Sequence, residues 1–235
     1  MPDSCKIGVK QYMEFDRFAD EYANILDKSI SLSGEDSSYF AEYKATYLRR
    51  ILGPAFAGRV LDFGCGVGLL AQYIRKHLAP SRIDGFDVSK ESIGKVDPVL
   101  SSQGTFTCSL NELGRDYDVI VVANVMHHIS PELRQNVIQD LAGRLAPDGM
   151  LSIFEHNPAN PVTRWVVDRC PFDDDAILLP SRETASYVKT AGLRLKRQDY
   201  IVFMPAILSW LRPLEASLRW LPLGAQYVTL ATKNA

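Results

Sequence analysis

From Arg59 onward, short apolar runs alternate with helix-like segments. Most of these runs are dense in Val, Ile, Leu and Phe, which is typical of strands that are buried on both faces. Strands that alternate with helices form a mostly parallel sheet with helices on both sides. The predicted strands are residues 60–63, 82–87, 105–107, 118–123, 150–155, 195–203 and 227–232.

Local signals bound the helices between these strands. Residues 69–78 read as a helix after the first strand, and residues 131–145 as another after the fourth. Ser130 suits the N-cap of the second helix, and Pro131 suits its first position, where no N–H is required. A third helix, residues 181–191, is predicted to end at Gly192, which readily takes a left-handed conformation.

Two amphipathic segments precede the sheet, FDRFADEYANILDKS and YFAEYKATYLRRIL, and both carry aromatic residues on one face. We predict that they cover the carboxyl edge of the sheet as a lid. The chain is therefore expected to be one domain, residues 1–235, with a helical lid at 1–56 and an α/β core at 57–235. A Trp- and Leu-rich insertion at about 206–222 separates the last two strands.

The stretch VLDFGCGVG places three glycines at alternate positions directly after the first strand. Gly64, Gly66 and Gly68 let the backbone turn tightly and come close to a ligand. Asp87 ends the second strand 19 residues after Gly68, where an acid is expected to bind ribose hydroxyls. The spacing differs from the G-x-G-x-x-G of pyrophosphate-binding turns, and the carboxylate of Asp62 would repel pyrophosphate. A positively charged nucleoside without phosphate is therefore favoured.

The stretches VLDFGCGVGLLA, IDGFDVS and YDVIVVANVMHHI resemble the successive motifs of class I S-adenosylmethionine-dependent methyltransferases, including the small-molecule, ubiquinone-type subgroup. The resemblance runs from about Phe15 to the end of the chain. It implies a Rossmann-like α/β fold with seven strands in the order 3-2-1-4-5-7-6, the last of them antiparallel, and helices on both faces. It also implies S-adenosylmethionine as the cofactor.

Position by position, the resemblance implies a cofactor-binding set. Its members are Asp62 and the backbone of Gly64, Cys65, Gly66 and Gly68 beside the methionine part, Asp87 at the ribose, Val88 on the adenine, and the backbone of Asn124 at the methionine amino group. Ser109 and Leu110 fall where the family often has an acid and a small apolar residue against the adenine. The acid is absent here, so this contact departs from the family pattern.

Two residues of the predicted lid belong to the same set. Tyr22, in ADEY, resembles a lid tyrosine whose ring faces the sulfonium through a cation–π contact, and a core aromatic is the alternative. Lys44, in EYK, resembles a lysine that meets the methionine carboxylate in some relatives. A solvated helix face is the alternative for this lysine.

Three histidines lie at predicted strand ends, where a substrate would bind: His127, His128 and His156. Methyl transfer is an in-line displacement in which positioning and exclusion of water supply most of the acceleration, so a base is required only for a protonated acceptor. Adjacent residues point in different directions, and the resemblance implies a structural role for His128. His127 and His156 are therefore the candidate catalytic residues, and a loop-capping role is the alternative for His156.

The segment FEHNPANPVTRWVVDRCPFDDDAILL follows the fifth strand, where an acceptor is expected to bind. Asn157 is predicted to hydrogen-bond the substrate, and Arg164 to hold an anionic group unless it pairs with a surface acid. The insertion places Trp210 and several leucines near helical spacing. It is interpreted as a pocket wall or as an interfacial element that reaches a lipid-linked acceptor, with a dimer contact or core packing as the alternative.

Composition limits the classes of partner that the chain is expected to bind. A net charge of -2 and a pI near 6.1 give no overall attraction to nucleic acid, and no dense basic patch is present, so no nucleic-acid partner is expected. Four cysteines without Cys-x-x-Cys spacing and an N-terminus without a signal-peptide core favour a cytoplasmic location. No metal is expected, because His127 and His128 lack the spacing of ligands on one helical face and residues 173–175 are typical of a solvated helix start.

Together these features predict S-adenosylmethionine-dependent methylation of a small, partly apolar molecule by a monomer or homodimer. Oxygen is the favoured acceptor atom, and nitrogen and carbon stay open. One alternative is methylation of a quinone or polyprenyl-linked lipid at a membrane surface. The alternative from another class is a cofactor-binding module that catalyses no transfer.

Overall fold

The computed structural model describes residues 34–170, 173 and 176–233, so the first predicted lid segment, with Tyr22, lies outside the described residues. The strands are β1 (Arg59–Phe63), β2 (Arg82–Phe86), β3 (Phe106–Thr107), β4 (Tyr117–Ala123), β5 (Leu145–His156), β6 (Arg194–Ile201) and β7 (Gln226–Thr232). The α-helices are α3 (Ser37–Leu52), α4 (Leu69–Leu78), α5 (Lys90–Gly94), α6 (Pro98–Ser101), α7 (Pro131–Arg144), α8 (Pro161–Val167), α9 (Ser181–Thr190) and α10 (Glu215–Leu218). Short 3₁₀ helices are η2 (Leu110–Glu112), η3 (Met126–His128) and η5 (Ala206–Leu214).

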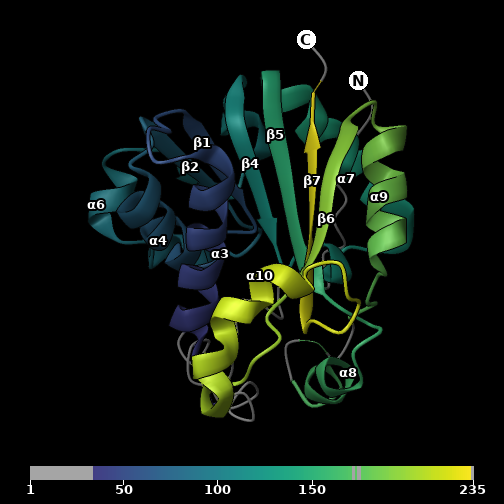
Figure 1. The fold of residues 1–235 in the computed structure, drawn as a ribbon. Helices are drawn as coiled ribbons and strands as arrows, with labels where there is room; N and C mark the ends of the chain where they lie inside the picture. Colours follow the sequence, from purple (N-terminus) through teal and green to yellow (C-terminus); the bar gives the residue numbers. More distant parts are fainter. Residues whose placement is uncertain (1–33, 171–172, 174–175, 234–235) are drawn as a thin grey trace.

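Within the described residues, seven strands form one sheet in the order β3-β2-β1-β4-β5-β7-β6 (Figure 1). Strands β1 to β5 pair in parallel, and β7 runs antiparallel to both β5 and β6. The predicted fold class is confirmed, including the antiparallel last strand. Strand β5 begins at Leu145, five residues earlier than predicted, because Tyr117 pairs with Leu145 beyond a register shift between the two strands.

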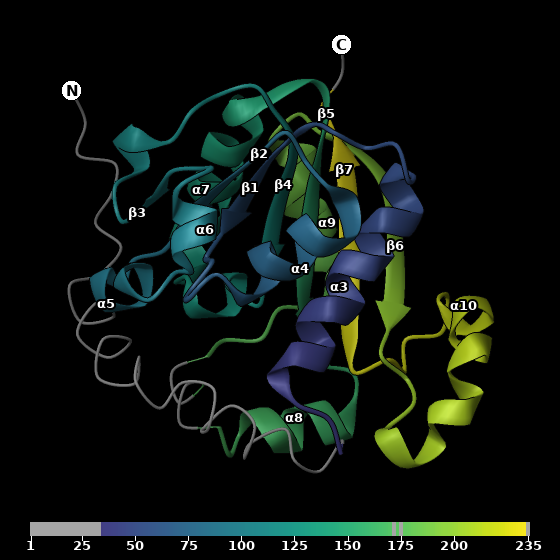
Figure 2. The ribbon, with the colours of Figure 1, turned by 90° about the vertical axis from the view of Figure 1, so that its left-hand side faces the viewer.

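The side chains of β4 alternate between two hydrophobic cores. Val119 and Val121 pack with α3 and α4, whereas Ile120 and Val122 pack with α7 and α9. Figures 1 and 2 show the same division, with α3 and α4 on one face of the sheet and α7 and α9 on the other. All four side chains are at most 1% exposed, which explains an apolar run without polar interruption.

The predicted helix boundaries agree closely with the structure. Helix α4 has the predicted bounds, and Gly192 follows α9 with φ of +78°, in the left-handed region that favours glycine. Ser130 occupies the N-cap position of α7, but its side chain makes no capping hydrogen bond. Its backbone carbonyl accepts from the N–H of Leu133 instead, at 2.9 Å.

Helix α3 packs with α4 on one face of the sheet, although the sequence predicted it as part of a lid. Its N-cap is Asp36, whose Oδ1 accepts from the N–H of Tyr39 at 2.8 Å. Ala45, Tyr47 and Leu48 are buried in the core that α3 shares with α4. Only the first turns of α3 reach the carboxyl edge, so this segment differs from a lid that lies over the edge along its whole length.

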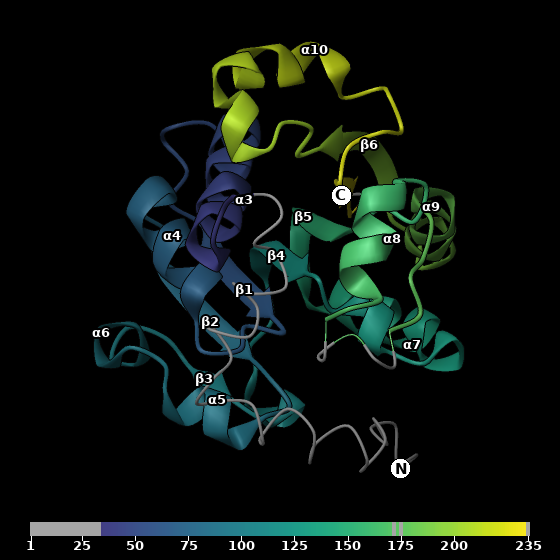
Figure 3. The same ribbon diagram turned by 90° about the horizontal axis from the view of Figure 1, so that it is seen from below.

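The carboxyl edge of the parallel strands is surrounded by α3, α8, η5 and α10 (Figure 3). The predicted insertion at 206–222 contains η5 and α10, and its backbone kinks at Leu208. Each helix in the described part of the chain is too short or too polar to cross a membrane. The edge is therefore enclosed by short helices that follow strands or precede β1, and these helices frame the site.

Candidate functional site

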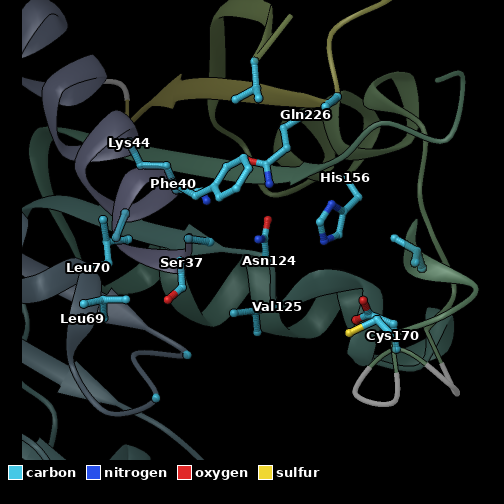
Figure 4. A pocket seen from close by; sticks show the side chains of 18 of the residues that line it. Ser37, Phe40, Lys44, Leu69, Leu70, Asn124, Val125, His156, Cys170 and Gln226 are labelled. Atoms are coloured by element: carbon cyan, nitrogen blue, oxygen red, sulfur yellow. The ribbon is translucent and has the colours of Figure 1, made fainter. Parts of the chain in front are cut away.

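A cavity of about 620 Å³ opens at the carboxyl ends of β1, β2, β4 and β5 (Figure 4). The first turns of α3, helix α8 and residues 202–205 complete its walls. Strand β1 leads into α4 on one face of the sheet, and β4 leads into α7 on the other. Neighbouring strands that diverge in this way leave a crevice between them, which is the usual ligand site of an open parallel sheet.

The glycine turn after β1 forms the floor of this cavity. The N–H groups of Gly64 and Cys65 both donate to the carbonyl of Phe86, at 2.7 and 2.9 Å, which holds the turn against β2. Gly64 has φ of +80°, and a Cβ there would lie 2.2 Å from Cγ2 of Val125. Gly66 has φ of +51°, and a Cβ there would meet nothing within 4 Å. Gly64 is therefore required by the protein's own packing, whereas Gly66 leaves space open to a ligand.

Asp62 places a buried carboxylate at the cavity. Its side chain is 1% exposed, and no group of the described chain hydrogen-bonds to its Oδ2. Burial, supported by the charge of Asp87, raises the pKa of Asp62 to about 7, against the opposing effects of the Ala71 backbone and of Lys44. A buried acceptor without a partner is costly, so this oxygen suits a ligand that brings a cationic donor.

Asp87 fixes the glycine turn and faces the cavity. Its Oδ2 accepts from the N–H of Gly66 at 2.7 Å, and its Oδ1 accepts from the N–H of Ser89 at 2.9 Å. Gly68 follows as the N-cap of α4, with φ of +82°. These bonds orient the carboxylate at the cavity, and a carboxylate is a group that accepts from the hydroxyl donors of a ligand. Val88 also lines the cavity, as expected.

Asn124 provides a second unpaired acceptor, at the end of β4. Its φ of +58° is unusual for a residue other than glycine, and its N–H donates to the carbonyl of Phe154 at 2.9 Å. Its Oδ1 is buried, and nothing in the described part of the chain donates to it. Asn124 and Asp62 thus present two acceptor oxygens from adjacent strands to the same cavity.

Lys44 lies at the cavity on α3 and is 5% exposed, so the solvated helix face considered for it is wrong. Burial lowers the pKa of its ammonium to about 8, although the carboxylates of Glu155 and Asp62 favour the charged form. Its Nζ lies 6.0 Å from the centre of the Phe40 ring. The cavity therefore holds a positive group opposite its acceptor oxygens.

His127 and His128 exchange the roles predicted for them. His127 is 2% exposed and does not line the cavity, because its Nδ1 donates to Oε2 of Glu155 at 2.6 Å. His128, predicted to be structural, lines the cavity together with Asp173. Burial alone would lower the pKa of His127, but the carboxylates of Glu155 and Asp173 outweigh it and raise the pKa to about 9.

His156 lines the cavity, as the sequence predicted. Burial, together with the positive charge of His127, lowers its pKa to about 4, against the carboxylates of Asp173 and Glu155. The ring is therefore neutral at physiological pH and offers one nitrogen as a hydrogen-bond acceptor. Its orientation toward Asn124 and Gln226 can be followed in Figure 4.

The predicted substrate residues lie elsewhere. Asn157 is buried, its Nδ2 donates to the carbonyls of Pro222 and Gly224 at 3.2 and 2.8 Å, and its Oδ1 accepts from the N–H of Ala159 at 3.0 Å. It fixes a loop instead of reaching the cavity. Arg164 is an exposed residue of α8 that points away from the cavity lining, and Trp210 is 73% exposed and forms no pocket wall.

The expected adenine contacts of Ser109 and Leu110 also lie outside the cavity lining. The N–H of Ser109 donates to Oγ1 of Thr107 at 3.0 Å, which turns the chain after β3. Leu110 packs against the hydrophobic core. The missing acid at Ser109 was the signal in the sequence that this position departs from the family.

Several cavity residues were not found by sequence analysis. They include Ser37 and Phe40 on α3, Val162 and Val166 on α8, Phe203 and Met204 after β6, and Gln226 at the start of β7. The sequence motifs that predicted the site lie where β1, β2, β4 and β5 end. These further residues come from helices and from the connection between β6 and β7, which carry no such motif. A spacing signal existed for the two helices, because residues 37 and 40 of α3 and residues 162 and 166 of α8 each share one helical face.

Comparisons with known proteins agree with this geometry. A family model described as a methyltransferase domain matches residues 36–198. A stretch of 96 residues is 24% identical to the mitochondrial ubiquinone biosynthesis O-methyltransferase of Saccharomyces cerevisiae, and it covers 38% of this chain and 30% of the yeast protein.

Two solved structures share the fold over nearly the whole chain. Magnesium protoporphyrin IX methyltransferase from Synechocystis PCC 6803, with bound SAH, is 17% identical with a TM-score of 0.67, over 95% of this chain and 98% of that one. The N-methyltransferase NodS from Bradyrhizobium japonicum WM9, in complex with S-adenosyl-L-homocysteine, is 17% identical with a TM-score of 0.65, over 96% and 99%. At these identities the similarity shows the fold alone.

The close approach of Gly64 to Val125 in the glycine turn can be tested by substitution. Gly64→Ala should lower the free energy of unfolding by about 1–3 kcal/mol, because the added methyl group strains a left-handed residue and meets Val125. Urea denaturation measures the change. Gly143→Ala is the matched control, since a Cβ at this α7 position meets nothing, and it should stabilise the chain by up to about 1 kcal/mol. Equal effects of the two substitutions would contradict the packing argument.

Proposed function

The chain belongs to the methyltransferase domain family, and from this membership we propose that it transfers a methyl group from S-adenosylmethionine to a small, partly apolar acceptor, with oxygen as the favoured acceptor atom. The observation that carries the proposal is the unpaired, buried carboxylate oxygen of Asp62 beside the open turn at Gly66. S-adenosylmethionine supplies a methyl group on a sulfonium, which leaves as a neutral thioether.

The charges of the cavity match the methionine part of this cofactor. We assign the methionine ammonium to Asp62 and to the backbone of Asn124, and the methionine carboxylate to Lys44. Asp62 and Lys44 are both buried, and each carries a pKa shifted toward its neutral form, so an ion of opposite sign restores the charge of each. A pyrophosphate would face the Asp62 carboxylate instead, which disfavours a dinucleotide.

Asp87 and Val88 are assigned to the nucleoside part. The Asp87 carboxylate is oriented at the cavity by the N–H groups of Gly66 and Ser89, and we assign it to the ribose hydroxyls. Val88 lines the same end of the cavity. Tyr22, outside the described residues, stays a prediction for the sulfonium side.

The acceptor side is mostly apolar. Phe40, Val162, Val166, Phe203 and Met204 line the cavity from three different segments. Apolar walls exclude water and hold a partly apolar molecule in one orientation, and positioning of this kind supplies most of the acceleration in an in-line displacement. The acceptor is thus expected to carry a hydrophobic body and one polar reacting group.

His156 is assigned to that polar group. Its ring is neutral at physiological pH, so one nitrogen accepts a hydrogen bond from an acceptor hydroxyl and orients it. A pKa of about 4 makes His156 a weak base, and orientation is therefore its main contribution. Asn157, Arg164 and Trp210, which lie outside the cavity, receive no role at the acceptor.

A lipid-linked acceptor is the second candidate, and exposed tryptophans favour it. Trp210 and Trp220 are 73% and 75% exposed, and Ile207 between β6 and these residues is 85% exposed. They follow directly on residues 203–205, which line the cavity. Tryptophan favours the headgroup boundary of a bilayer, so this segment is suited to hold the cavity mouth against a lipid surface.

The assignment of Asp62 predicts a pH-dependent affinity. Binding of the methionine ammonium favours the Asp62 carboxylate, and binding of the methionine carboxylate favours the Lys44 ammonium. Affinity should therefore be highest between the free-protein pKa values of about 7 and about 8, and below pH 7 it should fall by up to about tenfold per pH unit. Isothermal titration calorimetry with S-adenosylhomocysteine from pH 8 to pH 5 measures this. Asp62→Asn should weaken binding at pH 8 by at least about tenfold and flatten the profile.

Adenosine is the matched control ligand, because it lacks the methionine part. Its affinity should stay constant across the same pH range. A parallel loss of adenosine binding, or an unchanged profile in Asp62→Asn, would reject the contact between Asp62 and the methionine ammonium.

The acceptor side is tested with methyl-labelled S-adenosylmethionine and an extract of the native host, separated afterwards into water-soluble and lipid-soluble fractions. We expect labelled product, and His156→Ala should reduce its rate of formation at least about tenfold while cofactor affinity changes less than about twofold. His77→Ala, at a half-buried residue of α4 outside the cavity lining, is the control and should leave the rate unchanged. No labelled product with the wild-type protein would favour a cofactor-binding module without transfer activity.

Flotation with vesicles of phosphatidylcholine and phosphatidylglycerol tests the lipid alternative. The wild-type protein should float with the vesicles, and the double substitution Trp210→Asp, Trp220→Asp should reduce the floating fraction several-fold. Val99→Asp, at an exposed residue of α6, is the control. Wild-type protein that stays unbound would reject the lipid surface and leave the small-molecule acceptor in place.

A further inference from the structure

Three metal-ligating side chains from two distant segments meet beside the cavity. Nε2 of His127 lies 3.4 Å from Oδ1 of Asp173, and Nε2 of His128 lies 3.5 Å from the same oxygen. All three ligand atoms lie within 4.8 Å of one another. The two histidines follow β4, and Asp173 follows α8, so only the fold brings them together.

The distances are those of ligands around a metal ion. A charge-assisted hydrogen bond between nitrogen and carboxylate is about 2.7–2.9 Å long, shorter than either contact. Ligand atoms about 2.0–2.1 Å from a tetrahedral ion lie about 3.3–3.4 Å apart. Both measured contacts match the edges of such a tetrahedron, and without an ion the contact between His127 and Asp173 is a hydrogen-bonded ion pair.

Glu155 completes the arrangement behind His127. Its Oε2 accepts from Nδ1 of His127 at 2.6 Å, and its Oε1 accepts from the N–H groups of Val125 and Met126 at 3.0 and 2.7 Å. A histidine that binds a metal through one nitrogen usually donates its other N–H to a carboxylate or carbonyl, which fixes the tautomer and the ring. Glu155 fixes His127 in this way, with Nε2 directed toward Asp173.

Asp173 is held in place through its backbone. Its N–H donates to the carbonyl of Cys170 at 2.9 Å, and its carbonyl accepts from the N–H of Ala176 at 2.9 Å. The N–H of Ile177 donates to the carbonyl of His127, also at 2.9 Å, which ties the segment after Asp173 to the turn after β4. The carboxylate is therefore positioned before any ion binds.

We propose that His127, His128 and Asp173 bind one divalent transition-metal ion, with Zn²⁺ as the best match to two imidazoles and one carboxylate. Three protein ligands leave a fourth position open, as in zinc sites that bind water or substrate. His128 and Asp173 line the cavity, so this position faces the acceptor side and takes a water or an oxygen of the acceptor. Binding of the ion displaces a proton from His127.

The adjacent histidines gave no metal signal in the sequence, because ligand spacing was judged along a single helix. The third ligand lies 45 residues after His128 and becomes visible only in the fold. The inference goes beyond the proposed function and is independent of it, since metal binding is measured without a methyl donor.

The test uses the full chain, free of affinity tags and stripped with a chelator. Titration with Co²⁺ should give one ion per chain and the intense visible absorption of a four-coordinate site, and Zn²⁺ should abolish this absorption by competition. His128→Ala and Asp173→Asn should each weaken Zn²⁺ binding at least tenfold, as measured by calorimetry. His77→Ala, which removes the histidine paired with Glu42 on the surface, is the matched control and should bind like the wild type.

The proposal is overturned if the wild-type chain binds no Co²⁺, or shows only the weak absorption of a six-coordinate ion. It is also overturned if His128→Ala binds Zn²⁺ as tightly as the wild type. Circular dichroism establishes that each variant is folded. Should one variant fail to fold, the other variant and the wild-type stoichiometry decide the question.

Discussion

The parallel pairing of β1 with β4 is the constraint on which the site depends. Asp62 pairs with Val121 and Phe63 with Val122, so the two strands end together while their chains diverge to opposite faces of the sheet. A Cβ at Gly66 would meet nothing within 4 Å, so the turn after β1 leaves space open. Within the described residues nothing donates to Oδ2 of Asp62 or Oδ1 of Asn124, which makes binding of a donor-rich ligand favourable.

Glu155 interacts with both His127 and Lys44. It is completely buried at the end of β5, and its hydrogen bonds to two backbone N–H groups and to His127 hold the turn that carries Asn124 and Val125. Although burial alone would raise its pKa, the charge of His127 lowers it, so the carboxylate stays ionised. The negative charge of Glu155 in turn favours the charged form of the Lys44 ammonium. One buried carboxylate thus orients the imidazole of His127 and favours the charged form of Lys44.

Sequence analysis predicted the sheet well and placed the glycine turn and its two acids at the cavity, because both depend on local patterns. Apolar runs specify strands that are buried on two sides, and Asp62, Gly66 and Asp87 are placed by the ends of β1 and β2. The acceptor end depends on contacts between distant segments. Asn157 is bound to residues more than 60 positions away, and His127 is withdrawn from the cavity by Glu155. Neither contact has a spacing signal, so the direction of these side chains was not predictable.

The protonation state of His156, which lines the cavity, depends on burial and on the neighbouring His127. His156 is buried beside His127, with ring centres 5.1 Å apart, and burial, followed by the positive charge of His127, lowers its pKa to about 4, so the ring stays neutral. The neutral ring offers one nitrogen as a hydrogen-bond acceptor to the cavity. Glu155 holds His127 in place through its hydrogen bond, which links the protonation state of the cavity-lining His156 to a carboxylate outside the cavity lining.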